Sequence, residues 1–328
     1  MQPLKLAVIG CSFLVYDMLM ECIKPLPVEC AAICGAPEET EKIRRRYNCG
    51  KHYGDYREML EKERPRVVLL FPASGDTFEA AKACLKAGAY VFAERPVCGG
   101  SAQAQELIAL QKETGCYVMP RYNRRCAPAY MMAKEIIARP EFGRADMFTA
   151  NYYAGPYASE KAMVWSHFSH IIDAMISLVG DMRLLHADKI VRDEQRAGYN
   201  LSFLSESGAI GMVQSGFMLC YEYPMERVEV TGDGRCVIIE NMRSLTYHRP
   251  APERKYGGKM ILADGGDALC WMQNYGQMTL FSYYGFEGCL EEIVDAAANG
   301  GPPSFHMDDA ARTIRLLEDI ERKAVLHG

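Results

Sequence analysis

The first half of the chain alternates short apolar runs with segments in which apolar positions recur every three or four residues. The runs predict strands and the periodic segments predict helices. We expect strands at 6–9, 28–34, 67–71, 90–93 and 118–119, and helices at 14–23, 38–47, 57–62, 74–87 and 101–114. Ser101 is expected to cap its helix, and Gly88 and Gly115 to end theirs. Such alternation predicts a parallel sheet covered by helices on both faces.

The pattern changes after residue 125. Helices are expected at 127–138, 165–179, 286–298 and 308–326, the last capped by Asp308, and strands at 144–154, 184–192, 198–204, 209–216, 226–231 and 235–240. Turn residues between neighbouring strands indicate an antiparallel sheet. We therefore predict an α/β protein with a doubly wound parallel sheet over 1–122 and an α+β domain with an open, mostly antiparallel sheet over 123–328. The terminal helices are expected to pack back on the first domain.

Composition limits the classes of function. The chain has 328 residues, is 49% apolar and carries a net charge of −5, as expected of a globular protein. Its basic runs are too short to predict nucleic-acid binding. We expect no signal peptide, and no apolar stretch nears the length of a membrane span. These observations favour a cytoplasmic protein without a membrane or nucleic-acid partner.

Thirteen cysteines are many for this length, and the number is odd. None of them forms a C-x-x-C pair, and Cys30 and Cys34 are spaced along one predicted strand. A disulfide framework or a zinc site would need tighter paired spacing. We interpret most of the cysteines as small buried apolar residues in a reducing compartment.

The turn after the first strand reads Gly10-Cys11-Ser12-Phe13-Leu14-Val15. A dinucleotide fingerprint would read G-x-G-x-x-G there. Gly10 keeps the residue of the tight turn. Ser12 narrows the approach to a pyrophosphate but can donate a hydrogen bond, and Val15 is expected to push the helix outward. A helix N-terminus still offers free N–H groups to an anion, so nucleotide binding is weakened but not excluded.

Six segments, in order, resemble the glucose–fructose oxidoreductase / inositol dehydrogenase / MocA family over almost the whole chain. They are LAVIGC, LKAGAYVFAERPV, RYNRRCAPAY, FGRADMFTANY, HIIDAMISLVG and ERVEVTGDGRCVIIEN. The resemblance implies a Rossmann domain and an α+β domain whose open sheet forms a homodimer or homotetramer. It also implies hydride transfer between NAD or NADP and a small sugar, cyclitol or related polyol.

The resemblance also assigns residues to the cofactor. The Glu94-Arg95-Pro96 segment matches the family's Glu-Lys-Pro, whose Lys contacts the nicotinamide ribose and the substrate. Arg95 keeps the charge and the donors but cannot act as a base. At the end of the second strand, Gly35 stands where an acid would bind ribose, and Arg44 to Arg46 are an alternative contact for a 2′-phosphate, although a solvated helix face is favoured. The candidate cofactor residues are Gly10, Ser12, Phe13, Leu14, Phe71, Pro72, Ser74, Glu94 and Arg95.

The family's acid–base pattern D-x-x-x-H-x-x-D falls on 166–173. His170 matches the catalytic His and Asp173 the later Asp, whereas Ser166 replaces the first Asp. A His near neutral pKa can take a hydroxyl proton as hydride leaves. We assign catalysis to His170, Arg95 and Ser166. His167, His170 and Asp173 could alternatively form a metal face, but no further ligand cluster is evident, so no metal is predicted.

The remaining polar residues of this region are candidates for substrate binding. Tyr152 and Tyr153 are adjacent on a strand, so both cannot face the site, and Lys161 could replace a missing cation. The expected substrate residues are Arg125, Tyr153, Lys161, His167 and Asp173.

A second reading belongs to another class of function. Departures from the family pattern fall at Ser12, Val15, Gly35, Thr77, Arg95 and Ser166, which are nearly all cofactor or proton-transfer positions. The alternative is a non-catalytic or repurposed member, a binding or regulatory subunit with weak or no nucleotide binding.

Overall fold

The structure is a computed structural model. The described residues are 3–12, 18–72, 77–155, 157–216, 224–250, 255–256, 259–260, 266–274, 276 and 279–327. The chain divides into two compact units. The first comprises Met1–Cys126 and Gly285–Arg315, and the second comprises Ala127–Tyr284 and Leu316–Gly328. Each unit is described by itself.

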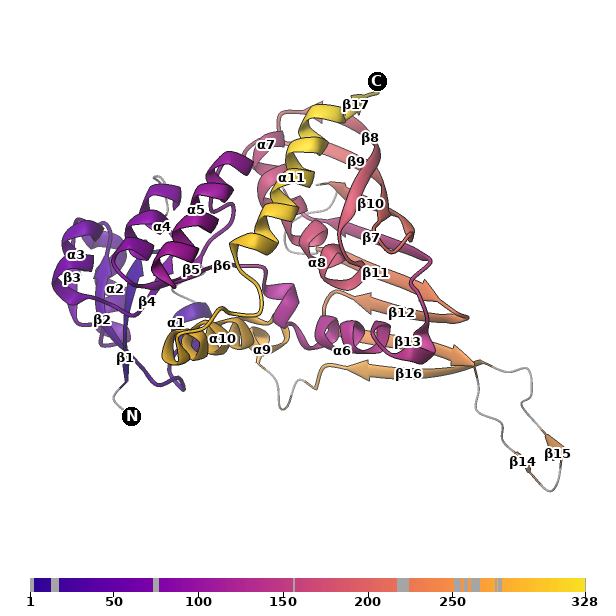
Figure 1. The fold of residues 1–328 in the computed structure, drawn as a ribbon, viewed down its shortest axis with the longest axis horizontal. Helices are drawn as coiled ribbons and strands as arrows, with labels where there is room; N and C mark the ends of the chain where they lie inside the picture. Colours follow the sequence, from indigo (N-terminus) through magenta and orange to yellow (C-terminus); the bar gives the residue numbers. More distant parts are fainter. Residues whose placement is uncertain are drawn as a thin grey trace. The chain divides into compact units, whose positions relative to one another are not determined.

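Unit 1 contains, within its described residues, a six-stranded parallel sheet (Figure 1). Its order is β3-β2-β1-β4-β5-β6, the arrangement of a dinucleotide-binding Rossmann fold. The strands are β1 (Leu4–Ile9), β2 (Val28–Cys34), β3 (Lys51–Tyr53), β4 (Val67–Leu70), β5 (Tyr90–Ala93) and β6 (Val118–Pro120). The four residues of β4 and of β5 are all buried, because helices cover both faces of a parallel sheet.

The helices of unit 1 are α1 (Met20–Cys22), α2 (Pro37–Arg46), α3 (Tyr56–Glu63), α4 (Thr77–Lys86), α5 (Ser101–Thr114) and α10 (Phe286–Asn299). α3, α4 and α5 form one contiguous layer, while α10, from far along the chain, contacts α1, β4 and β5 (Figure 1). The division between the units falls inside α11 (Met307–Lys323).

Unit 2 contains, in the part that the structure describes, a nine-stranded sheet in the order β16-β13-β12-β11-β7-β10-β9-β8-β17. β10 pairs with β7 and β17 with β8 in parallel, and the other neighbours are antiparallel. The strands are β7 (Met147–Tyr153), β8 (Met182–Asp193), β9 (Arg196–Ser205), β10 (Ile210–Gly216), β11 (Met225–Gly232), β12 (Arg235–Glu240), β13 (Ser244–Pro250), β16 (Gly266–Met272) and β17 (Val325–Leu326). The predicted fold class is confirmed.

One face of this sheet packs against α6 (Pro128–Ile137) and α8 (Ser169–Val179) (Figure 1). Buried Phe148 and Ala150 of β7 alternate with exposed neighbours, which places the core under this face. Short segments complete the unit: α7 (Glu160–Ala162), α9 (Leu280–Tyr283), the 3-10 turn Pro140–Phe142 and the pair β14 (Lys255–Tyr256) and β15 (Lys259–Met260). A further 3-10 turn, Asn123–Cys126, belongs to unit 1.

Several helix ends differ from the prediction. Gly100, not Ser101, is the N-cap residue of α5, and Ser101 is its first helical residue. Asp308 lies inside the first turn of α11, whose start is fixed instead by the Asp309 carboxylate, which accepts from the His306 N–H at 3.1 Å. The expected helix 308–326 stops at Lys323, because Val325 and Leu326 pair with β8. Residues 14–17 of the expected helix 14–23 lie outside the described ranges, and the α-helix in the rest of it is α1, Met20–Cys22.

The expected helix 165–179 begins earlier, at Glu160, where the Ser159 hydroxyl accepts from the Ala162 N–H. It runs through a π-helical turn at Met163–Phe168 into α8. By length and composition, Glu160–Val179 could cross a membrane, so the prediction that no stretch nears that length was wrong. Serines and histidines interrupt the apolar run, but the mean hydropathy of the segment is still high. Because 83% of its most apolar window is buried inside the protein, it has the burial of a core helix.

Candidate functional site

The turn after β1 is closed by a glycine that no other residue can replace without movement. Gly10 has φ +89°, and a Cβ there would lie 2.1 Å from the carbonyl oxygen of Phe71 and 2.5 Å from the Cα of Pro72. Its N–H donates to the Cys34 carbonyl at 2.8 Å. Gly10, Phe71 and Pro72 therefore meet at the carboxyl ends of β1, β2 and β4, the edge where open α/β sheets bind ligands.

Ser12 carries the polar group of this turn that could meet a phosphate. Its Oγ is buried, and it has no hydrogen-bond partner among the described residues. A buried hydroxyl without a partner is costly, and a phosphate oxygen would satisfy it. The turn therefore fits the phosphates of a dinucleotide. The predicted contacts Phe13, Leu14 and Ser74 lie outside the described residues.

The end of β2 offers less to a cofactor. The Gly35 carbonyl oxygen is 2.9 Å from Nε2 of His52. Arg44 and Arg45 are ion-paired with Glu41, and Arg46 with Glu21, at the protein surface. This arrangement matches the solvated helix face that the sequence favoured over a 2′-phosphate site.

The carboxyl end of β5 holds a group of charges around Glu94. Arg121 Nε and Nη2 donate to the Glu94 carboxylate at 2.9–3.1 Å, and the Arg95 N–H donates to Oε1 at 2.9 Å. The Arg95 guanidinium lies 3.6 Å from the same oxygen and is nearly buried. Burial opposes ionisation of Glu94, but the charges of Arg121 and Arg95 outweigh it and lower its pKa. Glu94 therefore stays ionised and orients Arg95. Arg121 supports Glu94 in this role, and the sequence did not reveal that contribution.

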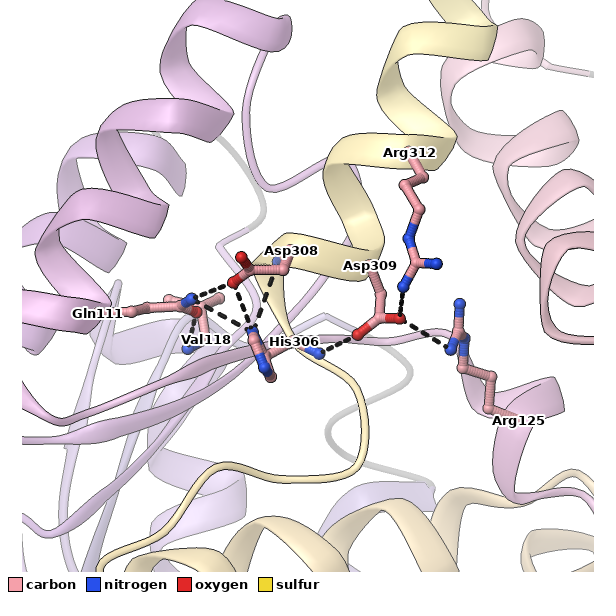
Figure 2. Close-up of polar contacts among 7 residues, drawn as sticks. All are labelled: Gln111, Val118, Arg125, His306, Asp308, Asp309 and Arg312. Carbon is pink, nitrogen blue, oxygen red and sulfur yellow. Dashed lines mark hydrogen bonds and ion pairs between the residues drawn. The ribbon is translucent and has the colours of Figure 1, made fainter. Parts of the chain in front are cut away.

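Arg125, predicted to bind substrate, is engaged at the start of α11. Its Nη1 lies 3.4 Å from Oδ1 of Asp309, which also pairs with Arg312, as Figure 2 shows. Its guanidinium also lies over the Phe305 ring, 5.3 Å from the centroid. These contacts fix Arg125 to the helix start, and its assignment to substrate remains a prediction.

The π-helical turn of unit 2 places His167 in an aromatic group. Its ring is fully buried and stacks on Tyr152, with centroids 3.9 Å apart. Nδ1 lies 2.8 Å from the Tyr157 hydroxyl and Nε2 lies 3.1 Å from the Tyr152 carbonyl oxygen. A carbonyl only accepts, so Nε2 carries the proton and Nδ1 accepts from Tyr157. With both nitrogens occupied by the protein, His167 is better suited to support the site than to bind substrate.

His170, one turn along, contacts the same tyrosine. Its ring meets the edge of Tyr152 with centroids 6.4 Å apart, and it retains slight exposure. Asp173 is fully buried, Ser166 is half-buried and Lys161 is exposed. π-Helical turns are frequent at functional sites, and here the turn brings two histidines to one tyrosine. The roles assigned to Ser166, Lys161, His170 and Asp173 remain predictions.

Tyr153 faces the other side of the sheet from the histidines. Its hydroxyl donates to Oε1 of Gln214 at 3.1 Å, and it pairs in register with exposed Met225. We had expected Tyr153 to bind substrate, but Tyr152 is the tyrosine beside the histidines. Alternation allows only one of the two to face the histidines, and the expectation fell on the other one.

Within the described ranges, no group of three or more His, Cys, Asp or Glu side chains could hold a metal ion.

Comparisons with known proteins agree with this architecture. Residues 4–122 match a family model described as an oxidoreductase family with an NAD-binding Rossmann fold. An uncharacterized oxidoreductase of Escherichia coli, YhhX, is 31% identical over 44% of this chain and 43% of its own length. An inositol 2-dehydrogenase of Salmonella typhimurium is 27% identical over 40% of each. The chain thus matches less than half the length of these two relatives.

Among solved structures, a levoglucosan dehydrogenase in complex with NADH and levoglucosan superposes with a TM-score of 0.82, covering 98% of this chain and 97% of that one. Its sequence is 16% identical, so this likeness supports the fold. Residues 4–122 are therefore similar to the NAD-binding Rossmann domain of an oxidoreductase family, and over the whole chain the likeness to the solved structure is one of fold.

Proposed function

We propose that the protein is an NAD(P)-dependent oxidoreductase that oxidises a CH–OH group, or reduces the corresponding ketone, of a sugar, cyclitol or related polyol. The observation that carries the proposal is Arg95. It is a nearly buried cation, held by Glu94 at the carboxyl edge of the Rossmann sheet. A cation held there stabilises negative charge that develops on a substrate oxygen.

The protein's own residues take three roles in this proposal. Arg95 binds and polarises the reacting oxygen, and it keeps its proton throughout. His170 accepts the hydroxyl proton during oxidation and returns it during reduction. His167 and Tyr157 position Tyr152, against which His170 rests. The nicotinamide, when bound, supplies the site to or from which the hydride moves, so that an alcohol becomes a ketone with release of one proton.

Support for the substrate class comes from the relatives. One is named inositol 2-dehydrogenase, and one superposed structure binds levoglucosan. The half-buried ring of Tyr152 suits a polyhydroxylated ring, because it offers apolar surface for stacking.

Nucleotide titration followed by turnover tests the proposal. Purified protein is titrated with NADH and with NADPH by fluorescence and calorimetry, and then assayed with inositols and sugars in the presence of NAD or NADP. We expect binding of at least one nucleotide, and turnover that falls at least about 100-fold in His170→Asn. The Glu58→Gln variant, altered at an exposed residue of α3 that has no predicted role in the site, is the control. No binding of either nucleotide at millimolar concentration would overturn the proposal and favour the non-catalytic subunit. Binding together with turnover that is lost in His170→Asn would overturn the subunit instead.

We also propose self-association through the face of the nine-stranded sheet opposite α8, as a homodimer or homotetramer. Exposed apolar side chains lie on that face at Met147, Ile210, Met212, Met225 and Met272. Apolar patches of this kind mark protein interfaces. The compartment we propose is the cytoplasm, because the cysteines that the structure describes are free thiols and most are buried.

A further inference from the structure

Two cysteines of unit 1 lie side by side although they are 19 positions apart. Cys30 is in β2, and Cys49 precedes β3, the neighbouring strand. The Gly50 N–H donates to the Cys30 carbonyl at 2.8 Å, which fixes the two backbones together. The Sγ atoms of Cys30 and Cys49 lie 2.6 Å apart. Only a small movement would bring the sulfurs to the length of a covalent bond, about 2.05 Å.

The environment of this pair differs from that of the isolated thiols. Burial alone raises the pKa of Cys84 to about 12, which leaves it protonated and unreactive. At Cys49, the hydrogen bond from Cys30 and the charge of Arg44 outweigh burial and lower the pKa. Cys30 is correspondingly held as a thiol by its bond to Cys49. The direction of these pKa shifts favours Cys49 as the nucleophile of the pair and Cys30 as the resolving thiol.

We propose that Cys30 and Cys49 form a reversible disulfide when the protein meets a peroxide. The Cys49 thiolate attacks one oxygen of hydrogen peroxide, the O–O bond breaks, and a sulfenic acid and hydroxide form. Cys30 then attacks the sulfenic sulfur, the S–O bond breaks, and a disulfide and water form. The two sulfurs lose two electrons to the peroxide, two waters are the net product, and a dithiol such as dithiothreitol reverses the change.

The bond would join β2 to the residues just before β3, the edge strand of the Rossmann sheet, and would enclose α2. The enclosed segment includes Gly35, at the carboxyl end of β2. Because the link removes freedom from the unfolded chain, the oxidised protein should unfold at a higher temperature, by roughly 5–10 °C. The inference rests on thiol chemistry, so it stands whether or not the protein turns over a polyol.

The full-length protein provides the test. Reduced protein is treated with a small excess of hydrogen peroxide, quenched in acid and digested with pepsin, and the linked peptides are mapped by mass spectrometry. We expect one dominant link, Cys30–Cys49, the predicted rise in Tm, and loss of both after dithiothreitol. A dominant link between other cysteines, or Cys49 recovered mainly as sulfinic or sulfonic acid, would overturn the proposal.

Serine variants separate the pair from the other thiols. Cys30→Ser and Cys49→Ser should each abolish the linked peptide and the rise in Tm. Cys30→Ser should in addition leave Cys49 open to overoxidation. Cys270→Ser, at an exposed thiol of unit 2, is the matched control and should behave as the unaltered protein. Should either pair variant fail to fold, the peptide map of the unaltered protein still decides the question.

Discussion

The Tyr157 hydroxyl donates a hydrogen bond of 2.8 Å to Nδ1 of His167, and Nε2 of the same ring donates one to the Tyr152 carbonyl oxygen. The histidine is thereby fixed in one tautomer and one orientation, stacked on Tyr152. This arrangement distinguishes a supporting histidine from His170, which the same tyrosine contacts by its edge.

Replacing His167 should therefore affect stability first. His167→Phe keeps an aromatic ring against Tyr152 but leaves two polar partners unsatisfied, and should lower the free energy of unfolding by about 2–4 kcal/mol. Tyr157→Phe removes one of these bonds and should cost about 1 kcal/mol. Urea unfolding followed by circular dichroism measures both. Equal losses in the two variants would contradict the assignment of two hydrogen bonds to the ring.

Glu94 should make stability depend on pH. Its pKa is lowered in the folded protein, so its contribution is complete above the ordinary value of about 4.5 and is lost as pH falls through the lower folded value. Glu94→Gln should cost about 2 kcal/mol at pH 7, because two nearly buried arginines lose their counter-charge. The difference from the unaltered protein should shrink between about pH 5 and pH 3.

The matched control for Glu94 is Glu58, whose ion pair with Lys62 is exposed. Glu58→Gln should change the free energy of unfolding by less than about 0.5 kcal/mol, as exposed helix pairs do. Unfolding curves at several pH values measure both variants. If the loss in the free energy of unfolding caused by Glu94→Gln stayed constant from pH 7 to pH 3, the charge of Glu94 would not be the source of that stability.

Hydrophobic periodicity predicted most of the long elements in order, because burial of alternate or every third or fourth residue is written directly in the sequence. It missed the seven-residue strands β13 and β16. It also missed β3, which is short and begins with Lys51 and His52, and it could not detect one π-helical turn within an apolar helix. Elements held by pairing to a distant strand, such as β17, also leave little local signal.

The candidate site was predicted unevenly for the same reason. Gly10 and Arg95 follow from local motifs. The partners of Arg125 and Cys30 do not, since Asp309 lies 184 positions from Arg125 and Cys49 lies 19 positions from Cys30. Such contacts are set by which strands and helices become neighbours, which a single sequence specifies only through the whole fold.

Arg95 permits a restoration experiment. Arg95→Lys restores the Lys of the Glu-Lys-Pro motif that this segment resembles. If Arg95 only binds and polarises the reacting oxygen, the new Lys should add a group that can exchange protons. We expect kcat to rise and to acquire an additional pH dependence. Arg95→Ala should lower kcat/KM by at least about 100-fold. Unaltered kinetics in both variants, measured from pH 6 to pH 10, would remove Arg95 from the mechanism.

The exposed apolar face of the nine-stranded sheet should decide the oligomeric state. Met212 and Met225, 41% and 42% exposed, flank β7 on that face. A charge at the centre of an apolar interface is strongly unfavourable, so the double variant Met212→Glu/Met225→Glu should convert the oligomer into monomers. Met131→Glu, at an exposed methionine of α6, is the control and should leave the mass unchanged. Light scattering after size exclusion gives the mass. An oligomer that survives the double substitution would place the interface elsewhere.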